Sequence, residues 1–523
     1  MSMPRSLVLI TVDCMRADHA GFLGYQRGTT PFLDSLAEAS IVFSDAIAAG
    51  APTYYSFPAI MASRHPLALG RYVIGVAPGE ATITSALRES GYATGAFLAG
   101  NPYLSPHFGY DAGFDTFRDF LDSEVSGTES SSTKTGHTEV NGPENNSAEV
   151  NSVPGSPAIS TKLSLRKRLN EYLANACYKH GPAGSIYDEL YFRYCQRVAG
   201  RSISSFDSLR RFPAAEVIVD EANAWLDSVS GSPFFLWLHF MDPHSPYYPR
   251  QEALQWLGDS TSPAQARYLN SYWNRSDIGA SRLERRRKDV IALYDAGIRW
   301  MDAQTRRLVD ELRRRELWQN CVFAVTADHG EEFLEHGGRH HSPSKLTEEL
   351  IHVPLLLHGS RSDATGPEFR RGPFSLIHLA PTLFGAIGIP APASFQGRSF
   401  WKQSQVIKDV DETAIVESIG TCTNPFEPAQ RRGSRVLAVR EIDYKLVIDF
   451  ATGHENLFNL RNDPGELRPL SPEDEKPVRR RLLERAREHI ARSASSRDAG
   501  QRLDAQLRDL RLEWRTSAGN IST

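Results

Sequence analysis

The chain has 523 residues, of which 41% are hydrophobic and 23% are charged, and 59 Lys and Arg stand against 63 Asp and Glu. This length corresponds to about three domains of roughly 150 residues, or to one large α/β domain with a smaller companion. A formal net charge of −4 offers no basic footprint, which argues against a dedicated nucleic-acid-binding protein.

The cysteines are few and widely spaced: Cys14, Cys177, Cys195, Cys321 and Cys422. Their spacing matches neither a C-x-x-C metal knuckle nor a dense disulfide framework, so we expect reduced, singly placed thiols. No run approaches the 18 apolar residues of a transmembrane helix, and the apolar run at 6–12 is too short for a signal peptide. The composition therefore predicts a cytoplasmic protein without a transmembrane segment.

Three short apolar runs are predicted as strands: LVLITV at Leu7–Val12, FFLWLHF at Phe234–Phe240 and VFAVTA at Val322–Ala327. None of them alternates between apolar and polar residues, which is typical of a strand buried on both faces of a sheet. Helical patterns precede the second and third runs, at 216–228 and 291–312. Strands alternating with helices indicate an α/β fold with a large, mostly parallel mixed sheet sandwiched by helices.

Two regions depart from this pattern. Residues 123–161 are rich in Ser, Thr, Asn, Gly and Pro and contain almost no large apolar side chains, which predicts a disordered insertion. Towards the C-terminus, the runs AIVES, VLAVR and YKLVID have hairpin-like spacing and predict a small antiparallel sheet. We therefore divide the chain into a large domain at 1–385, a small α+β subdomain at 386–475 and an Arg-rich helical tail at 476–523.

The helical tail carries one apolar stripe: Leu503, Leu507, Leu510 and Trp514. An Arg-rich helix of this kind has two interpretations, a surface for an acidic partner or a solvated face whose stripe docks on the rest of the protein. The stripe favours docking.

Each predicted strand leads into a chemically active side chain. Asp13 follows the first strand, Asp328 and His329 follow the third, and His244 comes shortly after the second. Ligands bind at the carboxyl ends of strands in open α/β sheets, so these side chains converge if the strands are parallel neighbours. Two carboxylates and an imidazole suit a divalent cation. For any single Asp a cap or turn is the alternative, but the adjacent Asp328 and His329 favour a metal.

Six stretches share this order with one known family: VLITVDCMRADHAGFLGY, TTPFLDSLAEASIVFSDAIA, SFPAIMASRHP, HFMDPHSPY, YDAGIRWMDAQTRRLVDELRRREL and VTADHGEEFLEHG. They resemble the sulfatase family of the alkaline phosphatase superfamily, and the later stretches IHLAPTLFGAIGIPAP and YKLVIDFATGHENLFNLRNDPGE resemble its closing part. The resemblance covers nearly the whole chain except the predicted insertion and the tail. It implies a metal-dependent ester hydrolase or transferase.

The resemblance also implies the metal ligands. Asp13 corresponds to the first ligand, and Asp328 with His329 corresponds to a late Asp-His pair. Many relatives carry a second acidic or amide ligand directly after the first Asp, where this chain has Cys14. The Cys14 thiol is either a ligand for a soft metal or a small buried residue, and a hard cation would lose an oxygen ligand here. The metal is left open among Ca, Mn, Mg and Zn.

Histidines are implied on the substrate side of the site. His244 resembles the imidazole that contacts the transferred group or its leaving oxygen. His340 and His341 lie near the position where relatives place a Lys or His on the anionic oxygens of the substrate, and the sequence does not choose between them. Asp242 is interpreted as a cap rather than a support for the site, and His378, which replaces a common Asp, as a structural histidine.

The nucleophile position is the most informative departure. Sulfatases carry Cys-x-Pro-x-Arg, whose Cys, or occasionally Ser, becomes formylglycine; counting back from Arg64 places Thr53 at that position and Phe57 at the Arg. Threonine cannot become the aldehyde, but a metal-bound hydroxyl can attack phosphorus, so Thr53 is predicted as nucleophile and metal ligand. Two alternatives stay open. Ser56 replaces it if Pro58 delays the start of the helix, and Thr53 is a plain N-cap in the other.

These residues predict a phosphate monoester or diester, rather than a sulfate ester, as the substrate. A sulfo-threonine lacks the exit that formylglycine provides, whereas a phospho-threonine can be cleared by water or by an acceptor alcohol. The alcohol is expected to be a small molecule, a glycan or a lipid-linked group. The alternatives are an arylsulfatase-like enzyme without formylglycine, an inactive metal- and anion-binding protein, an interaction scaffold, and a two-zinc variant of the site.

Overall fold

The computed structural model describes residues 5–121, 205–229, 231–359, 368–401 and 413–495, with scattered helical positions between 172 and 194. The predicted insertion at 123–161 and the predicted leucine stripe at 503–514 lie outside the described residues. Within the described ranges, no helix is both long enough and apolar enough to cross a bilayer.

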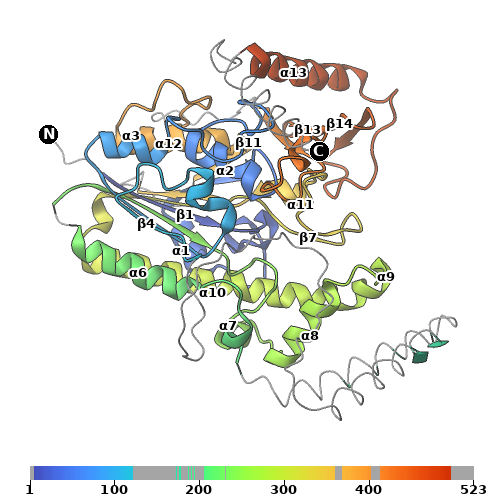
Figure 1. Cartoon of the computed structure of the whole chain (residues 1–523), viewed down its shortest axis with the longest axis horizontal. Helices are drawn as coiled ribbons and strands as arrows, with labels where there is room; N and C mark the ends of the chain where they lie inside the picture. The colour runs from blue at the N-terminus through green and yellow to red at the C-terminus, as the bar shows by residue number, and fades with distance from the viewer. Residues whose placement is uncertain are drawn as a thin grey trace, which may run out of the picture.

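A nine-stranded sheet forms the centre of the molecule (Figure 1). In spatial order its strands are β11 (Glu368–Ser375), β2 (Ser40–Ile47), β10 (Leu355–His358), β6 (Cys321–Ala327), β1 (Ser6–Val12), β5 (Phe234–Phe240), β3 (Ala93–Leu98) and β4 (Thr116–Arg118), with β9 (His352–Val353) paired to β2. Strand β10 is antiparallel to both of its neighbours, and β9 is antiparallel to β2. The remaining pairings are parallel, which confirms the predicted mostly parallel mixed sheet.

The three predicted strands are the three central ones. β1 lies between β5 and β6 and is parallel to both, and every residue of these strands is buried. Val12 is in register with Phe240 of β5 and with Ala327 of β6. All three strands therefore end at one level, so the side chains that follow them meet at a single edge of the sheet.

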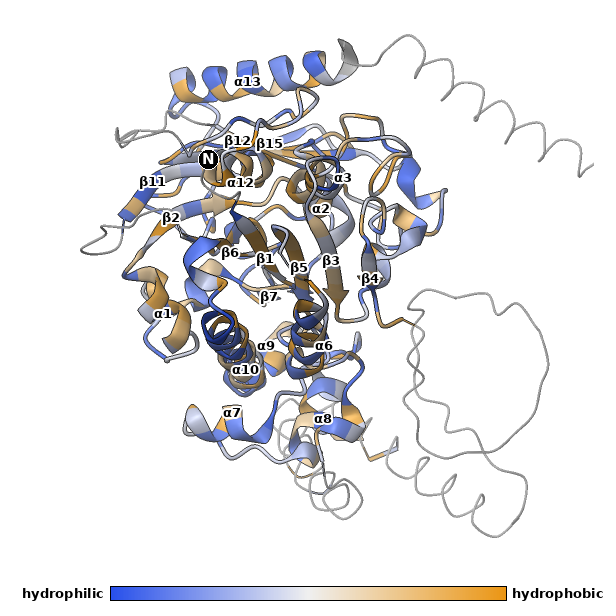
Figure 2. Cartoon of the chain, turned by 90° about the vertical axis from the view of Figure 1, so that its left-hand side faces the viewer, coloured by the Kyte–Doolittle hydropathy of each residue, from blue (hydrophilic) through white to orange (hydrophobic). Residues whose placement is uncertain are grey.

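Helices cover both faces of the sheet (Figures 1 and 2). One face carries α1 (Pro31–Ala37), α6 (Ala215–Ser228) and α10 (Arg287–Arg314), and the other carries α2 (Thr53–Ala62), α3 (Ile83–Glu89) and α12 (Leu379–Ile387). Helices α6 and α10 agree with the patterns predicted at 216–228 and 291–312. Figure 2 shows α10 largely hydrophilic outside, because its apolar residues recur at helical spacing and face the sheet: Val290, Leu293, Ile298, Met301, Leu308 and Leu312.

The predicted antiparallel sheet is also present. Its order is β12 (Ala414–Ile419), β13 (Arg435–Arg440), β14 (Tyr444–Asp449) and β15 (His454–Asn459), and all of its pairings are antiparallel. Helix α13 (Lys476–Ser495) packs on β13 and β14 through Val478, Leu482 and Ala486. The shorter elements are α7 (Gln251–Trp256), α8 (Pro263–Trp273), α9 (Ala280–Leu283), α11 (Glu348–Ile351) and the hairpin of β7 (Glu332–Phe333) and β8 (Arg339–His340).

Candidate active site

The ends of β1 and β6 bring the predicted metal ligands together. Asp13, Asp328 and His329 are completely buried, and His329 Nε2 lies 3.8 Å from Asp13 Oδ1 and 3.5 Å from Asp328 Oδ2. Cys14 follows Asp13 with a φ of +62°, a left-handed conformation that is uncommon outside glycine. This turn directs the Cys14 N–H to Asp328 Oδ1 at 3.3 Å, so the backbone itself ties the two strand ends together.

Thr53 approaches the same point from the face of the sheet that carries α2, α3 and α12. It is the first residue of α2, and its Oγ1 lies 3.2 Å from His329 Nε2 and 3.4 Å from Asp13 Oδ2. The N-cap position belongs to Pro52, and Thr53 Oγ1 is turned towards the carboxylates. The alternative of Thr53 as a plain N-cap is therefore wrong.

Ser56 does not occupy the nucleophile position. The prediction that Pro58 delays the helix to Ser56 is wrong, because α2 begins at Thr53 and holds Pro58 in its interior. A proline this near the start removes only one helical hydrogen bond. Ser56 is completely buried and donates its hydroxyl to the Asp328 carbonyl oxygen at 2.5 Å. Its role is to anchor α2 to the end of β6.

The pKa values of the two buried carboxylates, Asp13 and Asp328, are shifted in opposite directions. Burial and the charge of Asp13 raise the pKa of Asp328. Burial would also raise the pKa of Asp13, but His244, His239 and His329 lower it well below its ordinary value. Asp328 Oδ2 is buried and accepts no hydrogen bond from the described residues. A buried acceptor without a donor, beside a second carboxylate, is the environment that a cation would stabilise.

His329 is oriented as a metal ligand. Its Nδ1 lies 2.8 Å from the Gly330 carbonyl oxygen, which can only accept, so this nitrogen carries the proton. The ring then turns its Nε2 towards Asp13, Asp328 and Thr53. A backbone carbonyl that fixes the tautomer in this way is typical of metal-binding histidines.

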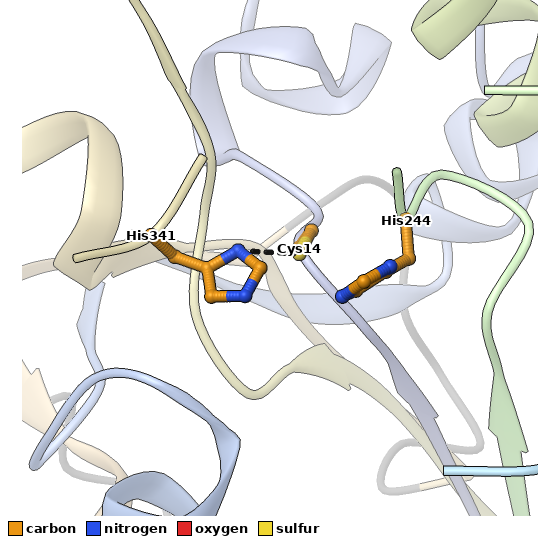
Figure 3. Close-up of side chains that lie close together, drawn as sticks. All are labelled: Cys14, His244 and His341. Atoms are coloured by element: carbon orange, nitrogen blue, oxygen red, sulfur yellow. Dashed lines mark hydrogen bonds between the residues drawn. The ribbon is translucent and has the colours of Figure 1, made fainter. Parts of the chain in front are cut away.

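Cys14 lies between two imidazoles, those of His244 and His341 (Figure 3). Its Sγ is 2.9 Å from Asp13 Oδ1 and 3.4 Å from His341 Nδ1, and the ring centres of His244 and His341 are 5.2 Å apart. Burial lowers the pKa of His244 to about 4, so this ring is neutral at neutral pH. Burial would lower the pKa of His341 as well, but the Glu331 carboxylate raises it. His341 is thus the ring better suited to an anion.

The hairpin of β7 and β8 separates the two candidate histidines. His340 Nε2 lies 2.7 Å from Asn274 Oδ1, whereas the ring of His341 lies 4.6 Å, centre to centre, from that of His329. The Glu331 carboxylate sits between them, 3.5 Å from His340 Nδ1 and 3.6 Å from His341 Nδ1. His341 therefore belongs to the cluster around Cys14, and His340 turns away towards Asn274.

Three polar residues of the site are absent from the sequence predictions. Asn101 donates its Nδ2 to Asp13 Oδ2 at 2.7 Å, and His239 Nε2 lies 3.5 Å from the same oxygen. Glu331 is completely buried beside His341. Asn101 closely follows the buried strand β3, and His239 is a polar residue inside the apolar run of β5. Both signals are visible in the sequence once the strands are known.

Two other polar residues have structural roles, as interpreted from the sequence. Asp242 Oδ2 accepts a hydrogen bond from the Ala215 N–H at the start of α6, and its Oδ1 pairs with Arg210. His378 Nδ1 accepts from the Arg398 N–H at 3.0 Å. Asp242 is therefore engaged with α6, which removes a ligand that the two-zinc variant needs.

Comparison with protein-family models identifies the family of the chain. The family model described as Sulfatase matches residues 5–389. The chain belongs to the sulfatase family. The match runs from the strand carrying Asp13, through Thr53, to the end of α12, and so includes every residue of the candidate site.

Curated sulfatase relatives are distant. Arylsulfatase K of Rattus norvegicus is 25% identical over 282 residues, covering 49% of this chain and 48% of that protein. The multifunctional alkaline phosphatase superfamily protein PehA of Trinickia caryophylli is 23% identical over 214 residues, covering 36% and 41%. The chain spans about half the length of the curated relatives it matches, or less.

The likeness to solved structures covers nearly the whole chain. The phosphonate monoester hydrolase of Agrobacterium radiobacter has a TM-score of 0.63 at 17% identity, covering 94% of this chain and 96% of that one. The sulfatase-family fold of this chain thus includes the four-stranded C-terminal sheet.

The donor set of this sulfatase-family site fits a divalent metal ion. Asp13, Cys14 and His329 each offer a ligand atom within 4.8 Å of the others, and Asp328 and Thr53 border them. Carboxylate, imidazole and thiol together favour zinc over calcium, which takes oxygen ligands. The unsatisfied Asp328 Oδ2 is consistent with this fit.

Proposed function

We propose that this chain is a metal-dependent phosphoryl-transfer enzyme in which Thr53 is the nucleophile. The observation that supports it best is the position of Thr53 Oγ1, which lies 3.2 Å from His329 Nε2 and 3.4 Å from Asp13 Oδ2 at the start of a helix. Among the residues of α2, Thr53 is the one whose hydroxyl lies beside Asp13 and His329. The helix N-terminus also favours a negatively charged group at that point.

Asp13, Asp328, His329 and Thr53 would hold the metal. When bound, a divalent ion supplies Lewis-acid charge that lowers the pKa of a bound hydroxyl and offsets charge developing on the transferred group. Asn101 keeps Asp13 oriented through its hydrogen bond to Oδ2. Asp13 Oδ2 also accepts from the Thr53 hydroxyl, at 3.4 Å.

The reaction proceeds in two displacements. Thr53 Oγ1 loses its proton towards Asp13 and forms a bond to phosphorus, while the bond between phosphorus and the ester oxygen breaks. His341, which Glu331 favours in its protonated form, faces the developing negative charge. The proton that the leaving oxygen needs comes from His341, and the neutral ring of His244 lies beside the His341 ring. Water or an acceptor alcohol then attacks phosphorus, and the bond to Thr53 breaks.

Phosphorus is favoured over sulfur because of how the intermediate must be cleared. A formylglycine hydrate expels sulfate by collapsing to its aldehyde, without attack on sulfur. The side chain of Thr53 has no second hydroxyl on the carbon that carries Oγ1. Its ester is therefore cleared only by attack at the phosphorus or sulfur atom. The arginine that supports the aldehyde hydrate is also replaced, and Phe57 in its place packs against His239 with ring centres 5.3 Å apart.

A sulfuric ester hydrolase is the second candidate, because relatives of this chain are named arylsulfatase. The test compares purified full-length protein on p-nitrophenyl phosphate, bis-p-nitrophenyl phosphate and p-nitrophenyl sulfate, with and without EDTA. We expect turnover of a phosphate ester that exceeds that of the sulfate, is lost with EDTA and is restored by zinc or manganese. Mass spectrometry after an acid quench should find phosphate on Thr53. Faster sulfate turnover would overturn the preference, and metal binding without any turnover would indicate an inactive protein.

A further inference from the structure

A second cluster of metal-ligand side chains lies at the opposite end of α2 from Thr53. His65 comes three residues after the helix ends, Glu417 belongs to β12, and His489 belongs to α13. One ring nitrogen of each histidine and one oxygen of Glu417 all lie within 4.8 Å of one another. The helix is about 15 Å long, so this cluster is separate from the site around Asp13.

The geometry of the cluster matches a zinc site. His489 Nε2 and Glu417 Oε2 are 3.2 Å apart, and two ligands of a tetrahedral zinc ion are separated by about 3.3 Å. The rings of His65 and His489 meet edge to face with centres 4.5 Å apart. Two histidines and one glutamate form a ligand set that zinc uses, with a fourth position left for water.

The polar atoms of the cluster are not all satisfied by the protein. His65 Nδ1 is buried and has no hydrogen-bond partner among the described residues. Burial and the neighbouring His489 lower the pKa of His65 to about 3, so its ring is neutral, the form that binds metals. Glu417 is completely buried and ionised, because His489 and Arg435 hold its pKa at about 2 in spite of burial.

A similar cluster elsewhere also contains a buried ring nitrogen without a partner, His336 Nε2, but its charge is already balanced by a lysine. Glu332, His336 and Glu349 also bring three ligand atoms together, but Lys345 Nζ lies 2.8 and 2.7 Å from the two oxygens of Glu332. A fixed ammonium group thus already fills the place of a cation. In the cluster of His65, the nearest cation is Arg435, whose Nε is 3.6 Å from Glu417 Oε2 and whose side chain is partly exposed.

An ion can also reach this cluster. A cavity of about 360 Å³ lies nearby, lined by neighbours of the ligands such as Leu67, Arg435 and Ile490 and not by the ligands themselves, so the ion would enter past His65. His65 is the partly exposed member, while His489 is only 4% exposed. The site is thus open on one side and closed on the other, which satisfies the need for an entry path.

We propose that His65, Glu417 and His489 bind a structural zinc ion that fastens α13 and the C-terminal sheet to the end of the helix carrying Thr53. The ligands come from three segments that are far apart in the sequence, so one ion would cross-link the loop after α2, strand β12 and helix α13. The ion replaces the proton that His489 and Glu417 otherwise share. This site is independent of the catalytic metal and of the proposed reaction.

The test uses full-length protein in which both carboxylates of the proposed catalytic ligand set are neutralised, Asp13→Asn with Asp328→Asn, and zinc as the probe. We expect this variant, after EDTA treatment and gel filtration, to take up one equivalent of zinc and to melt at a higher temperature with it. Adding His65→Gln or His489→Gln should weaken zinc binding ~100-fold, and His454→Gln, an exposed histidine on β15, should leave it unchanged. Cobalt in place of zinc should give the visible absorption of a four-coordinate ion.

Two outcomes would overturn the proposal. One is a folded Asp13→Asn, Asp328→Asn protein, checked by circular dichroism, that takes up no zinc. The other is an equivalent of zinc that survives both His65→Gln and His489→Gln. If the double Asn variant does not fold, the wild-type chain serves instead. It should bind two equivalents of zinc and His489→Gln one, whereas a single equivalent in both would refute the site.

Discussion

Two buried groups of acids and histidines show how differently the same side chains are used in this molecule. Around Asp295 in α10, His19 contacts Oδ1 at 2.6 Å, while Tyr25 and Arg27 donate to Oδ2 at 2.8 and 2.7 Å. Both oxygens of this carboxylate are satisfied. Around Asp328, one oxygen accepts nothing from the described residues and the nearest carboxylate is Asp13.

The contrast separates a structural ion cluster from a functional one. A buried charge with full hydrogen bonding holds segments together, whereas a buried charge with one oxygen left without a donor costs stability and is kept for another reason. The first group ties the segment at 19–27 to α10. The second group leaves the Asp328 Oδ2 oxygen free to bind a ligand of opposite charge. The predictions below test this difference.

The largest effect is expected at Thr53. Thr53→Ala should lower kcat for a phosphate ester by ~10³-fold or more, because the nucleophile is lost, while the free energy of unfolding changes little. Thr53→Ser retains a hydroxyl and should keep measurable activity and the covalent intermediate. Steady-state kinetics and urea denaturation of the three proteins check this, and an active Thr53→Ala would rule out the covalent mechanism.

Opposite responses are expected when each carboxylate is neutralised. Asp295→Ala should lower the free energy of unfolding by about 3–5 kcal/mol, since it leaves His19, Tyr25 and Arg27 without their acceptor. Asp328→Asn, measured in EDTA, should raise it by on the order of 1 kcal/mol, because one of two neighbouring buried charges is removed. The same substitution should abolish binding of the catalytic metal. Equal destabilisation by both would contradict the distinction.

The pH dependence of stability extends the comparison to an unpaired histidine. In the metal-free protein the pKa of His65 is about 3 when folded, against about 6.5 in the unfolded chain. Below pH 6.5 the unfolded state therefore gains a proton that the folded state cannot bind, and stability falls as the pH falls towards 3. Between pH 6.5 and 5 this group should cost about 2 kcal/mol.

His65→Gln should remove that loss. Urea denaturation in EDTA at pH 6.5 and 5.0 measures it, and the quantity to compare is the change in unfolding free energy between wild type and variant. His454→Gln is the matched control, because its ring is exposed. Parallel pH profiles for wild type and His65→Gln would show that the ring is not held neutral.

The smallest effect is expected at Cys14, which distinguishes this site from an all-oxygen one. Cys14→Ser should weaken zinc binding by about tenfold and leave manganese affinity nearly unchanged, since a thiol is the softer ligand. Cys321→Ser, a buried thiol within β6, should alter neither. Competition between the two metals, measured by isothermal titration calorimetry, gives the ratio, and an unchanged ratio would show that the sulfur does not bind the metal.

Much of this site could be predicted from the sequence, because it depends on strand ends. Short, uninterrupted apolar runs define β1, β5 and β6, and parallel strands end together, so Asp13, Asp328 and His329 had to converge once the strands were neighbours. Thr53 was identified by its distance from Arg64 in a family-like motif. These are local signals combined with one topological rule.

The remaining details depend on tertiary geometry. Asn101 reaches Asp13 only because β3 lies beside β5, and a single Asn carries no pattern of its own. The choice between His340 and His341 is made by the hairpin, where His340 has a φ of +64° and neighbouring side chains point to opposite sides of Glu331. The sequence left the start of α2 open between Thr53 and Ser56 because of Pro58, and the fold places it at Thr53 with Pro58 inside the helix.

The central place of β1 has a consequence for how the chain is made. Ser6 pairs with Cys321, and Leu7 pairs with Phe235, so both partners of this strand are synthesised long after it. At about 5–20 residues per second, this strand would wait ~15–60 s for its second partner to be synthesised. During that time an apolar segment with at least one free edge is exposed, and non-local pairing of this kind is slow. Nascent chains of this protein should therefore depend on chaperones until β6 has emerged.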